Sequence, residues 1–262
     1  MRSLLRIVLT FCALCIAASG AQAGLFERIF GERVAPVQDG AYIAADKIKF
    51  TLQRAGKNYL LRFDGDPEIY VLHADHTSLG GRMLKYDSGE TGLKVAGWGG
   101  LTLYTDWQPN GLPAVRAGDA GPFAPSPVTL KDVQFLAAQD AERLAHERHL
   151  RVPLVVNWSV LETDGALRAT ASEAIENAAR GIERFVHDRQ TRKLLMGRVR
   201  TVAFATGTRA SLVLKDKALI VTFNPERGYL GRASSREIAR ELSTLLNGTR
   251  EAAAHTGAAN AR

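Results

Sequence analysis

The sequence has very little cysteine. Its two cysteines, Cys12 and Cys15, both lie within the first 23 of 262 residues. Residues 24–262 therefore contain no thiol, and this part of the chain cannot form a disulfide, a thiolate nucleophile or a cysteine-ligated zinc or iron–sulfur site. Its stability has to come from packing, for which a chain of this length is ample.

Long apolar runs are also scarce. The uncharged run Ile7–Ala18 holds twelve residues, whereas a membrane-spanning helix needs about 20. Arg2 and Arg6 precede this run and Ala21-Gln22-Ala23 follows it, which is the order of a secretory signal peptide and its cleavage site. The rival interpretation is an uncleaved membrane anchor. We expect a signal peptide over residues 1–23 and a periplasmic or secreted mature chain without a membrane span.

The common local motifs of catalytic sites are missing as well. The sequence contains neither G-x-S-x-G nor S-x-x-K. The glycine-dense segment at 97–100 enters a predicted strand instead of the helix that a dinucleotide-binding loop needs. His146 and His149 are one residue too close for H-E-x-x-H. These observations favour a non-enzymatic protein with no cofactor, although a Ser/His/Asp constellation assembled from distant segments stays open.

Weak metal-ligand candidates follow one predicted strand. His73, Asp75 and His76 provide two imidazoles and a carboxylate, which are ligand types of zinc and of non-haem metals. This H-x-D-H pattern has no further ligand residue at a fixed spacing. The alternative is therefore a strand end whose polar side chains face water. We expect no metal, and keep these three residues as the first to test in a metal-dependent enzyme.

Positive charge is modest but unevenly placed. The formal net charge is +7, and residues 180–217 hold ten basic side chains against three acidic ones. A basic patch of this kind attracts envelope anions. The alternative is a solvated helix face with i,i+4 ion pairs, for which Glu176–Arg180 and Arg184–Asp188 have the spacing. Export would separate this patch from nucleic acid, so we expect no nucleic-acid partner.

The first half of the chain has the pattern of antiparallel β-structure. Apolar and polar residues alternate through 46–106, as in Ile48, Phe50 and Leu52, and turn sequences close each run. Six or seven short strands joined by hairpins predict a curved meander or a small barrel. The preceding segment 24–45 begins with a short amphipathic stretch at 24–34.

The second half predicts an α/β layer. Residues 107–128 contain five of the nine prolines and indicate a connector. Thr129 and Asp132 fit a capping box that opens a helix. Over residues 129–247 the order is α-β-α-β-β-α, with strands at 152–161, 199–205, 210–214 and 219–223, and helices from 129, at 171–196 and at 236–246. The tail at 248–262 is expected to be disordered. The predicted fold class is α+β.

Two segments have the residue types of a binding surface. The aromatic–glycine segment 98–107 could stack on a sugar or peptide, although its glycines also fit a tight corner. The loop 227–236 precedes the last helix, where free N–H groups and arginines suit a phosphate or carboxylate; its alternative is a capping box between Ser234 and Glu237. The candidate ligand-binding residues are Arg227, Arg232, Ser234, Ser235, Arg236, Trp98, Tyr104 and Trp107.

Three segments, at 59–72, 97–104 and 227–238, together carry a resemblance. In this order they resemble an alphaproteobacterial family of secreted proteins known only as a domain of unknown function. The resemblance implies an exported envelope protein and supplies no catalytic residues. We expect a periplasmic, non-enzymatic factor that binds an envelope component or a periplasmic protein. The alternative is a cell-wall-directed hydrolase, in which a metal could take part.

Overall fold

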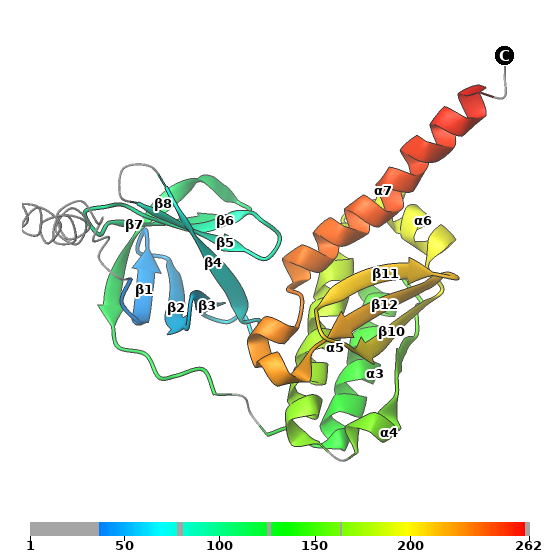
Figure 1. Cartoon of the computed structure of the whole chain (residues 1–262), viewed down its shortest axis with the longest axis horizontal. Helices are drawn as coiled ribbons and strands as arrows, with labels where there is room; N and C mark the ends of the chain where they lie inside the picture. Colours follow the sequence, from blue (N-terminus) through cyan, green and yellow to red (C-terminus); the bar gives the residue numbers. More distant parts are fainter. Residues whose placement is uncertain (1–36, 78–80, 125–126, 163, 260–262) are drawn as a thin grey trace, which may run out of the picture.

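The chain folds into a β-barrel followed by an α/β region (Figure 1). The computed structural model describes residues 37–77, 81–124, 127–162 and 164–259. The expected signal peptide, both cysteines and the amphipathic stretch at 24–34 lie outside these residues. None of the described helices combines the length and the apolar character that a membrane span requires.

Eight antiparallel strands close the barrel, each pairing with its neighbours in sequence and β1 pairing with β8. The hairpins predicted from the period-two pattern correspond to β2–β7. Together with the helices and sheet of the second half, the barrel confirms the mixed α+β class. The strands are β1 (Gly40–Ala44), β2 (Ile48–Ala55), β3 (Asn58–Phe63), β4 (Tyr70–His76), β5 (Arg82–Tyr86), β6 (Thr91–Val95), β7 (Leu101–Thr105) and β8 (Gln108–Gly118).

The expected connector at 107–128 is too long, because β8 occupies its first half. Proline removes only the backbone donor, and the carbonyl of Pro113 still accepts a hydrogen bond from Ala45 N at 3.2 Å. The register also shifts between Leu103 and Thr105 in the β7–β8 pair, an irregularity of the kind that accommodates proline. The connector between the two parts is therefore limited to the residues between Gly118 and Thr129.

The barrel interior is filled by side chains. Leucines from successive strands are fully buried, and a chain of aromatic rings crosses the core. Its centroid distances are 5.4 Å for Tyr42–Phe50, 6.3 Å for Phe50–Phe63, 6.1 Å for Phe63–Tyr70 and 5.4 Å for Tyr70–Tyr86. Stacked and edge-on contacts at these distances add to the stability from burial. These leucines and aromatic rings form the packed core of the barrel.

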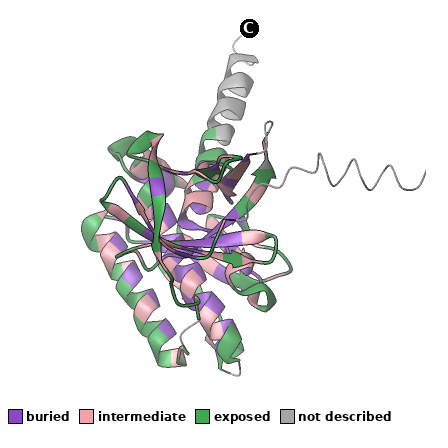
Figure 2. Cartoon of the chain, turned by 90° about the vertical axis from the view of Figure 1, so that its left-hand side faces the viewer, coloured by how far each residue is buried: buried purple, intermediate pink, exposed green. Residues whose placement is uncertain are grey.

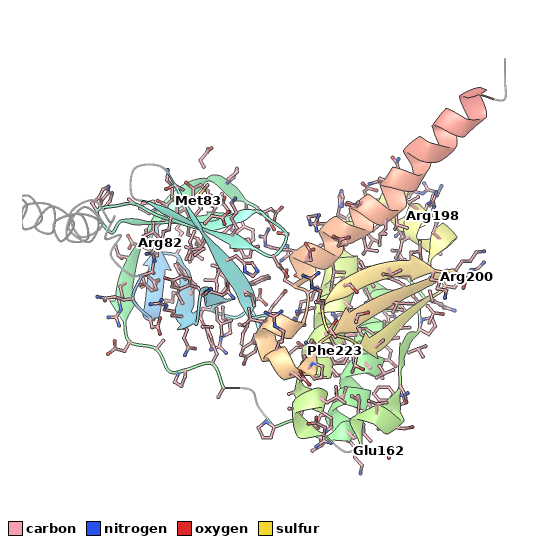
Figure 3. All side chains as sticks on the ribbon, in the orientation of Figure 1. Arg82, Met83, Glu162, Arg198, Arg200 and Phe223 are labelled. Carbon is pink, nitrogen blue, oxygen red and sulfur yellow. The ribbon has the colours of Figure 1, made fainter. Side chains whose placement is uncertain are left out.

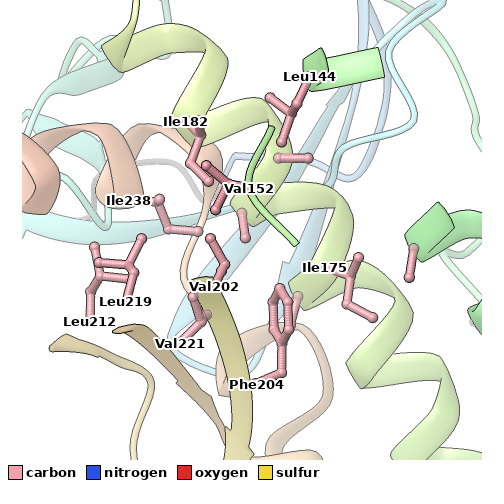
Figure 4. Close-up of a cluster of buried hydrophobic side chains, with 14 of the residues drawn as sticks. Leu144, Val152, Ile175, Ile182, Val202, Phe204, Leu212, Leu219, Val221 and Ile238 are labelled. Carbon is pink, nitrogen blue, oxygen red and sulfur yellow. The ribbon is translucent and has the colours of Figure 1, made fainter. Parts of the chain in front are cut away.

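The α/β region is a four-stranded sheet with helices packed on one face (Figure 4). The sheet order is β11-β12-β10-β9, in which β9, β10 and β12 are parallel and β11 is antiparallel. The elements are α3 (Leu130–Glu147), β9 (Leu154–Val156), α4 (Trp158–Leu161), α5 (Gly165–Phe185), α6 (Arg189–Arg198), β10 (Thr201–Thr206), β11 (Ser211–Lys215), β12 (Ala218–Phe223), η1 (Pro225–Gly231) and α7 (Ser235–Ala259).

Several boundaries differ from the predicted ones. The helix expected at 171–196 is divided into α5 and α6, because Asp188 caps a new helix by accepting from Thr191 N at 2.8 Å. The strand expected at 152–161 is β9 followed by the helical turn α4. Helix α7 continues to Ala259, through alanine-rich sequence of high helix propensity where a disordered tail was expected.

Other local predictions are confirmed. Thr129 and Asp132 form a reciprocal capping box at the start of α3. The strands predicted at 210–214 and 219–223 correspond to β11 and β12; their hairpin turns at Asp216 and Lys217, both with positive φ, as a two-residue hairpin turn requires. The helices present buried residues to the sheet and exposed residues to solvent (Figure 2).

Candidate functional site

The predicted anion-binding loop lies at the interface between the barrel and the α/β region (Figure 1). It comprises η1 and the first turn of α7. The carbonyl of Asn224 packs against Gly231, where an added Cβ would lie 1.9 Å from it. The N–H of Asn224 donates to the Gly231 carbonyl at 2.7 Å, so the two ends of η1 are joined. This closed loop places Ser234 and Ser235 against the barrel.

The free N–H groups at the start of α7 bind carboxylates of the barrel. Asp87 accepts from the amide of Ser234 at 2.7 Å and from its hydroxyl at 2.5 Å. Glu68 accepts from the amide of Ser235 at 2.7 Å and from its hydroxyl at 2.6 Å. A helix N-terminus favours negative charge. Here the chain itself supplies both anions at the position predicted to bind an external one.

The expected capping box is half formed. The amide of Glu237 donates to Ser234 Oγ at 3.2 Å, as in a capping box. The carboxylate of Glu237 binds Arg240 instead of returning to the amide of Ser234, and Asp87 takes its place. A residue of the β5–β6 turn thereby completes the cap of a helix in the other half of the molecule.

Two arginines of the predicted loop also bind protein groups. Arg232 is buried, pairs with Glu173 and donates to the carbonyl of Ile69 at 3.0 Å. Arg236 donates to Glu90 at 2.6 Å and pairs with Asp106 at 2.7 Å. Arg227 is exposed. Of the loop candidates, Arg227 alone presents its charged group to solvent within the described residues.

A third arginine, not predicted from the sequence, joins the same network. Arg184 of α5 donates to Ser235 Oγ at 3.0 Å, to Asp106 at 3.0 Å and to the hydroxyl of Tyr70 at 3.2 Å. The sequence instead predicted an ion pair between Arg184 and Asp188. That prediction is wrong, because Asp188 faces the start of α6, which it caps. The companion prediction is confirmed, since Arg180 and Glu176 pair at 2.7 Å.

Burial alters the ionisation of this interface. It raises the pKa of the Asp87 carboxyl above its usual value, and the hydrogen bonds from Ser234 offset only part of the effect. Burial likewise raises the pKa of Glu173 despite its contact with Arg232. It raises the pKa of Tyr86 to about 12; Arg236 lies 4.4 Å from the centroid of that ring. Burial therefore favours the protonated form of these carboxyl groups, and the hydrogen bonds from Ser234 and the contact with Arg232 oppose it.

An apolar cluster completes the interface. Leu60, Ile69 and Val71 of the barrel are buried and pack with Tyr229 and Leu230 of η1, and Phe123 of the connector adds to this cluster. Hydrogen-bonded carboxylates and apolar burial therefore act together at one joint. The polar and apolar groups of the 227–236 segment therefore attach the barrel to the α/β region.

The second predicted surface, around Trp98, remains open to solvent. Trp98 lies in the turn between β6 and β7, where Ala96 N donates to the carbonyl of Gly100 at 2.8 Å. Gly99 has φ +94°, which favours glycine. A Cβ added to Gly100 would lie 2.0 Å from the Trp98 ring. The indole therefore lies directly over the backbone of Gly100, while 87% of the residue stays exposed.

Tyr104 has a similar relation to a glycine. A Cβ added to Gly111 in β8 would lie 2.8 Å from the Tyr104 ring and 2.6 Å from the methyl group of Thr102. Glycine here permits a cross-strand ring to lie flat on the neighbouring strand, a known use of aromatic residues beside strand glycines. Both aromatic rings thus lie close to the backbone of a glycine.

Trp98 and Tyr104 line one groove of about 730 Å³ on the barrel. We call it the Trp98 groove. Trp107 lies at the other end of β7 and does not line it; Tyr86, also near in sequence, is buried in the barrel core. The lining residues are Val37, Gln38, Tyr42, Lys94, Val95, Ala96, Trp98, Gly99, Gly100, Leu101, Thr102, Tyr104, Pro113, Ala114, Val115 and Arg116.

The predicted metal candidates bind neighbouring side chains. Nδ1 of His73 lies 3.0 Å from Oδ1 of Asn58, and Asp75 pairs with Lys85 at 2.7 Å. The side chain of His76 lies outside the described residues. Within the described ranges no group of three histidine, cysteine, aspartate or glutamate side chains could hold a metal ion.

Comparison with known families assigns the chain. The family described as Domain of unknown function (DUF4908) matches residues 26–242. The chain belongs to this family. The DUF4908 match covers the barrel, the connector and the α/β region as far as Leu242 in α7, so both halves and the joint between them are part of the family's domain. No curated protein and no solved structure matches the chain.

Proposed function

We propose that this protein is an exported, non-enzymatic binding protein, and that the Trp98 groove binds a saccharide-bearing component of the cell envelope. The observation that carries the proposal is the exposed indole of Trp98 lying over Gly100. A flat indole face can stack on the apolar C–H face of a sugar ring. Because backbone contact already orders the ring, binding costs little further side-chain entropy.

The surroundings of the indole support a polar, neutral or anionic ligand. Lys94 and Gln38 are exposed at the groove and offer hydrogen-bond donors. Arg116 also lines it, but its guanidinium is bound to the carbonyl of Asp39 and to Asp119. Exposed tryptophans frequently dominate binding energy at interfaces. We expect Trp98 to supply most of the affinity and Lys94 to supply selectivity.

The proposal of export depends on the N-terminal segment, which has the charge, apolar run and small residues of a secretory signal. Cell fractionation followed by N-terminal sequencing tests it. We expect the protein in the periplasmic or secreted fraction, beginning at Gly24. A cytoplasmic protein that retains Met1 would contradict export and leave the groove proposal to be judged separately.

Trp98 fluorescence tests the groove. The chain has three tryptophans, so the double variant Trp107→Phe/Trp158→Phe leaves Trp98 as the single reporter. Titration with soluble peptidoglycan fragments and lipopolysaccharide oligosaccharides should shift its emission. Trp98→Ala should abolish binding measured by calorimetry, while Trp107→Ala, an exposed tryptophan outside the groove, should retain it. Unchanged emission with every saccharide, or full binding by Trp98→Ala, would refute the proposal; release of reducing ends would indicate a hydrolase.

A further inference from the structure

One face of the four-stranded sheet is not covered by the helices. The packed face carries Val202, Phe204 and Val221, which point toward α5 (Figure 4). The opposite face carries an apolar row that crosses all four strands. Its members are register partners of one another: Val155 in β9, Ala203 in β10, Ile220 in β12 and Val213 in β11.

This row is exposed at its two ends, whereas Ala203 and Ile220 in its middle are half-buried. Val155 is 50% and Val213 is 48% exposed, and both are valines at the edges of the sheet. Parallel strands are usually covered on both faces, because apolar residues project from each. In this sheet β9, β10 and β12 are parallel, and the described helices cover one face only. The apolar row is therefore suited to a second covering layer.

Positive charge borders the row at one end of the sheet. The parallel strands β9, β10 and β12 begin at this end, and β11 ends there. Arg151, Arg200, Lys215 and Lys217 lie at these strand ends against the single acid Asp216. Arg200 and Phe223 mark the two ends of the sheet (Figure 3). All four cations are exposed.

We propose that the uncovered face of this sheet, defined by Val155, Ala203, Ile220 and Val213, docks an amphipathic helix of a partner protein. The helix packs its apolar side on the row and places acidic residues against the basic strand ends. Opposite charges across an interface steer association and fix orientation. Packing a helix on a sheet is the layer arrangement that the other face already uses.

Other occupants fit the surface less well. A second copy of the chain packed face to face would present the same apolar row and basic strand ends, so it offers no matching cluster of acidic residues to the cations. A membrane surface would attract the cations, but peripheral insertion uses protruding Trp, Phe and Leu side chains. The row consists of valine, alanine and isoleucine side chains on the face of a sheet. A helix with an acidic end is complementary to both the apolar and the charged features.

Site-specific photo-cross-linking in the native cell tests this proposal. p-Benzoylphenylalanine at position 213 should cross-link to a segment of a second protein, identified by mass spectrometry of the linked peptide. That segment should have apolar residues at helical spacing and aspartate or glutamate at one end. The matched control places the same group at Phe135, an exposed apolar position on α3, where no such cross-link should form.

Charge reversal makes the test specific. Lys215→Glu/Lys217→Glu should remove the cross-link while leaving the thermal midpoint of the protein unchanged, because both lysines are exposed. Replacing the partner's acidic residues by lysine should restore it. Cross-links to a second copy, to lipid, or to a segment without acidic residues would overturn the proposal, as would no cross-link or one that survives charge reversal.

Discussion

The carboxylate of Asp87 accepts two hydrogen bonds from Ser234, from the amide at 2.7 Å and from the hydroxyl at 2.5 Å. Asp87 belongs to the turn after β5, and Ser234 immediately precedes α7. The two residues therefore join the barrel to the last helix of the α/β region. Glu68 and Ser235 make the parallel connection one residue further along.

We expect Asp87→Asn to destabilise the protein by about 1–3 kcal/mol, because an amide leaves one of the two Ser234 donors without an acceptor. Urea denaturation measures the change. The control is Asp64→Asn, an exposed aspartate of the β3–β4 loop, which should change stability by no more than about 0.5 kcal/mol. Equal stability of the two variants would mean that the Asp87–Ser234 contact contributes nothing.

The pH dependence of stability should carry the signature of Asp87. Burial raises the folded-state pKa of this carboxyl above the ordinary 3.8. The folded state therefore binds a proton more readily, and this stabilisation is lost as pH rises through the folded-state pKa. The advantage of the native protein over Asp87→Asn should be larger at pH 4 than at pH 7. A constant difference across this range would contradict the raised pKa.

We expect the arginines of the 227–236 segment to differ in their contribution to stability, according to the contacts that each one makes. Arg236→Ala removes partners Glu90 and Asp106 and the contact with the Tyr86 ring, and we expect a loss of about 2 kcal/mol. Arg236→Lys keeps the charge but loses the planar fork, so it should be intermediate. Arg227→Ala removes an exposed side chain and should be neutral in thermal unfolding. Similar losses for Arg227 and Arg236 would contradict this division.

Two helical glycines should respond to alanine with opposite signs. A Cβ at Gly181 in α5 would lie 2.6 Å from Ile238 and 2.9 Å from the carbonyl of Ser235, whereas a Cβ at Gly197 in α6 meets nothing within 4 Å. Alanine improves helix propensity by up to about 1 kcal/mol, and overpacking costs about 1–3 kcal/mol. Gly197→Ala should raise the thermal midpoint, and Gly181→Ala should lower it. A higher midpoint for Gly181→Ala would contradict this prediction, because it would mean that α5 and α7 can shift apart enough to accommodate the methyl group.

Gly100→Ala should displace the Trp98 indole, because the new methyl group would lie 2.0 Å from the ring. In the single-tryptophan background the fluorescence anisotropy of Trp98 should fall, and saccharide binding should weaken with it. Gly118→Ala, at a position with no atom within 4 Å of the added Cβ, is the matched control. Unchanged anisotropy would mean that Gly100 does not orient the indole.

Local patterns of the sequence were sufficient for the hairpins. Alternation and turn residues are properties of neighbouring positions, so β2–β7 and the capping box at Thr129 could be predicted. Barrel closure could not be predicted in this way, because β1 and β8 are the first and last strands of the barrel and are far apart in sequence. Short β1 and proline-containing β8 have weak local signals, and the pairing partner stabilises both as strands.

The candidate sites divide in the same way. The sequence identified Ser234, Ser235 and Arg236 as groups that attract an anion, since helix starts and arginines are local features. It could not identify Glu68 and Asp87 as the anions, because Glu68 follows a turn sequence and Asp87 begins one, so both have the sequence context of structural turn residues. Trp98 and Tyr104 line one groove and Trp107 does not, since Trp107 lies in the β7–β8 turn. Distance along the chain does not reveal which side of a barrel a residue occupies.

The long separation between the joined residues has a consequence for the order of folding. The carboxylates at 68 and 87 bind amides 167 and 147 residues later, so a growing chain completes its barrel well before their partners exist. Contacts of such long range are slow to form and cannot guide early steps. Until the segment that contains Ser234 and Ser235 is in place, Asp87 and Glu68 have no helix start to bind. Attachment of the barrel to the α/β region is then a late step of folding. A chain that ends before α7 lacks the residues that make these contacts.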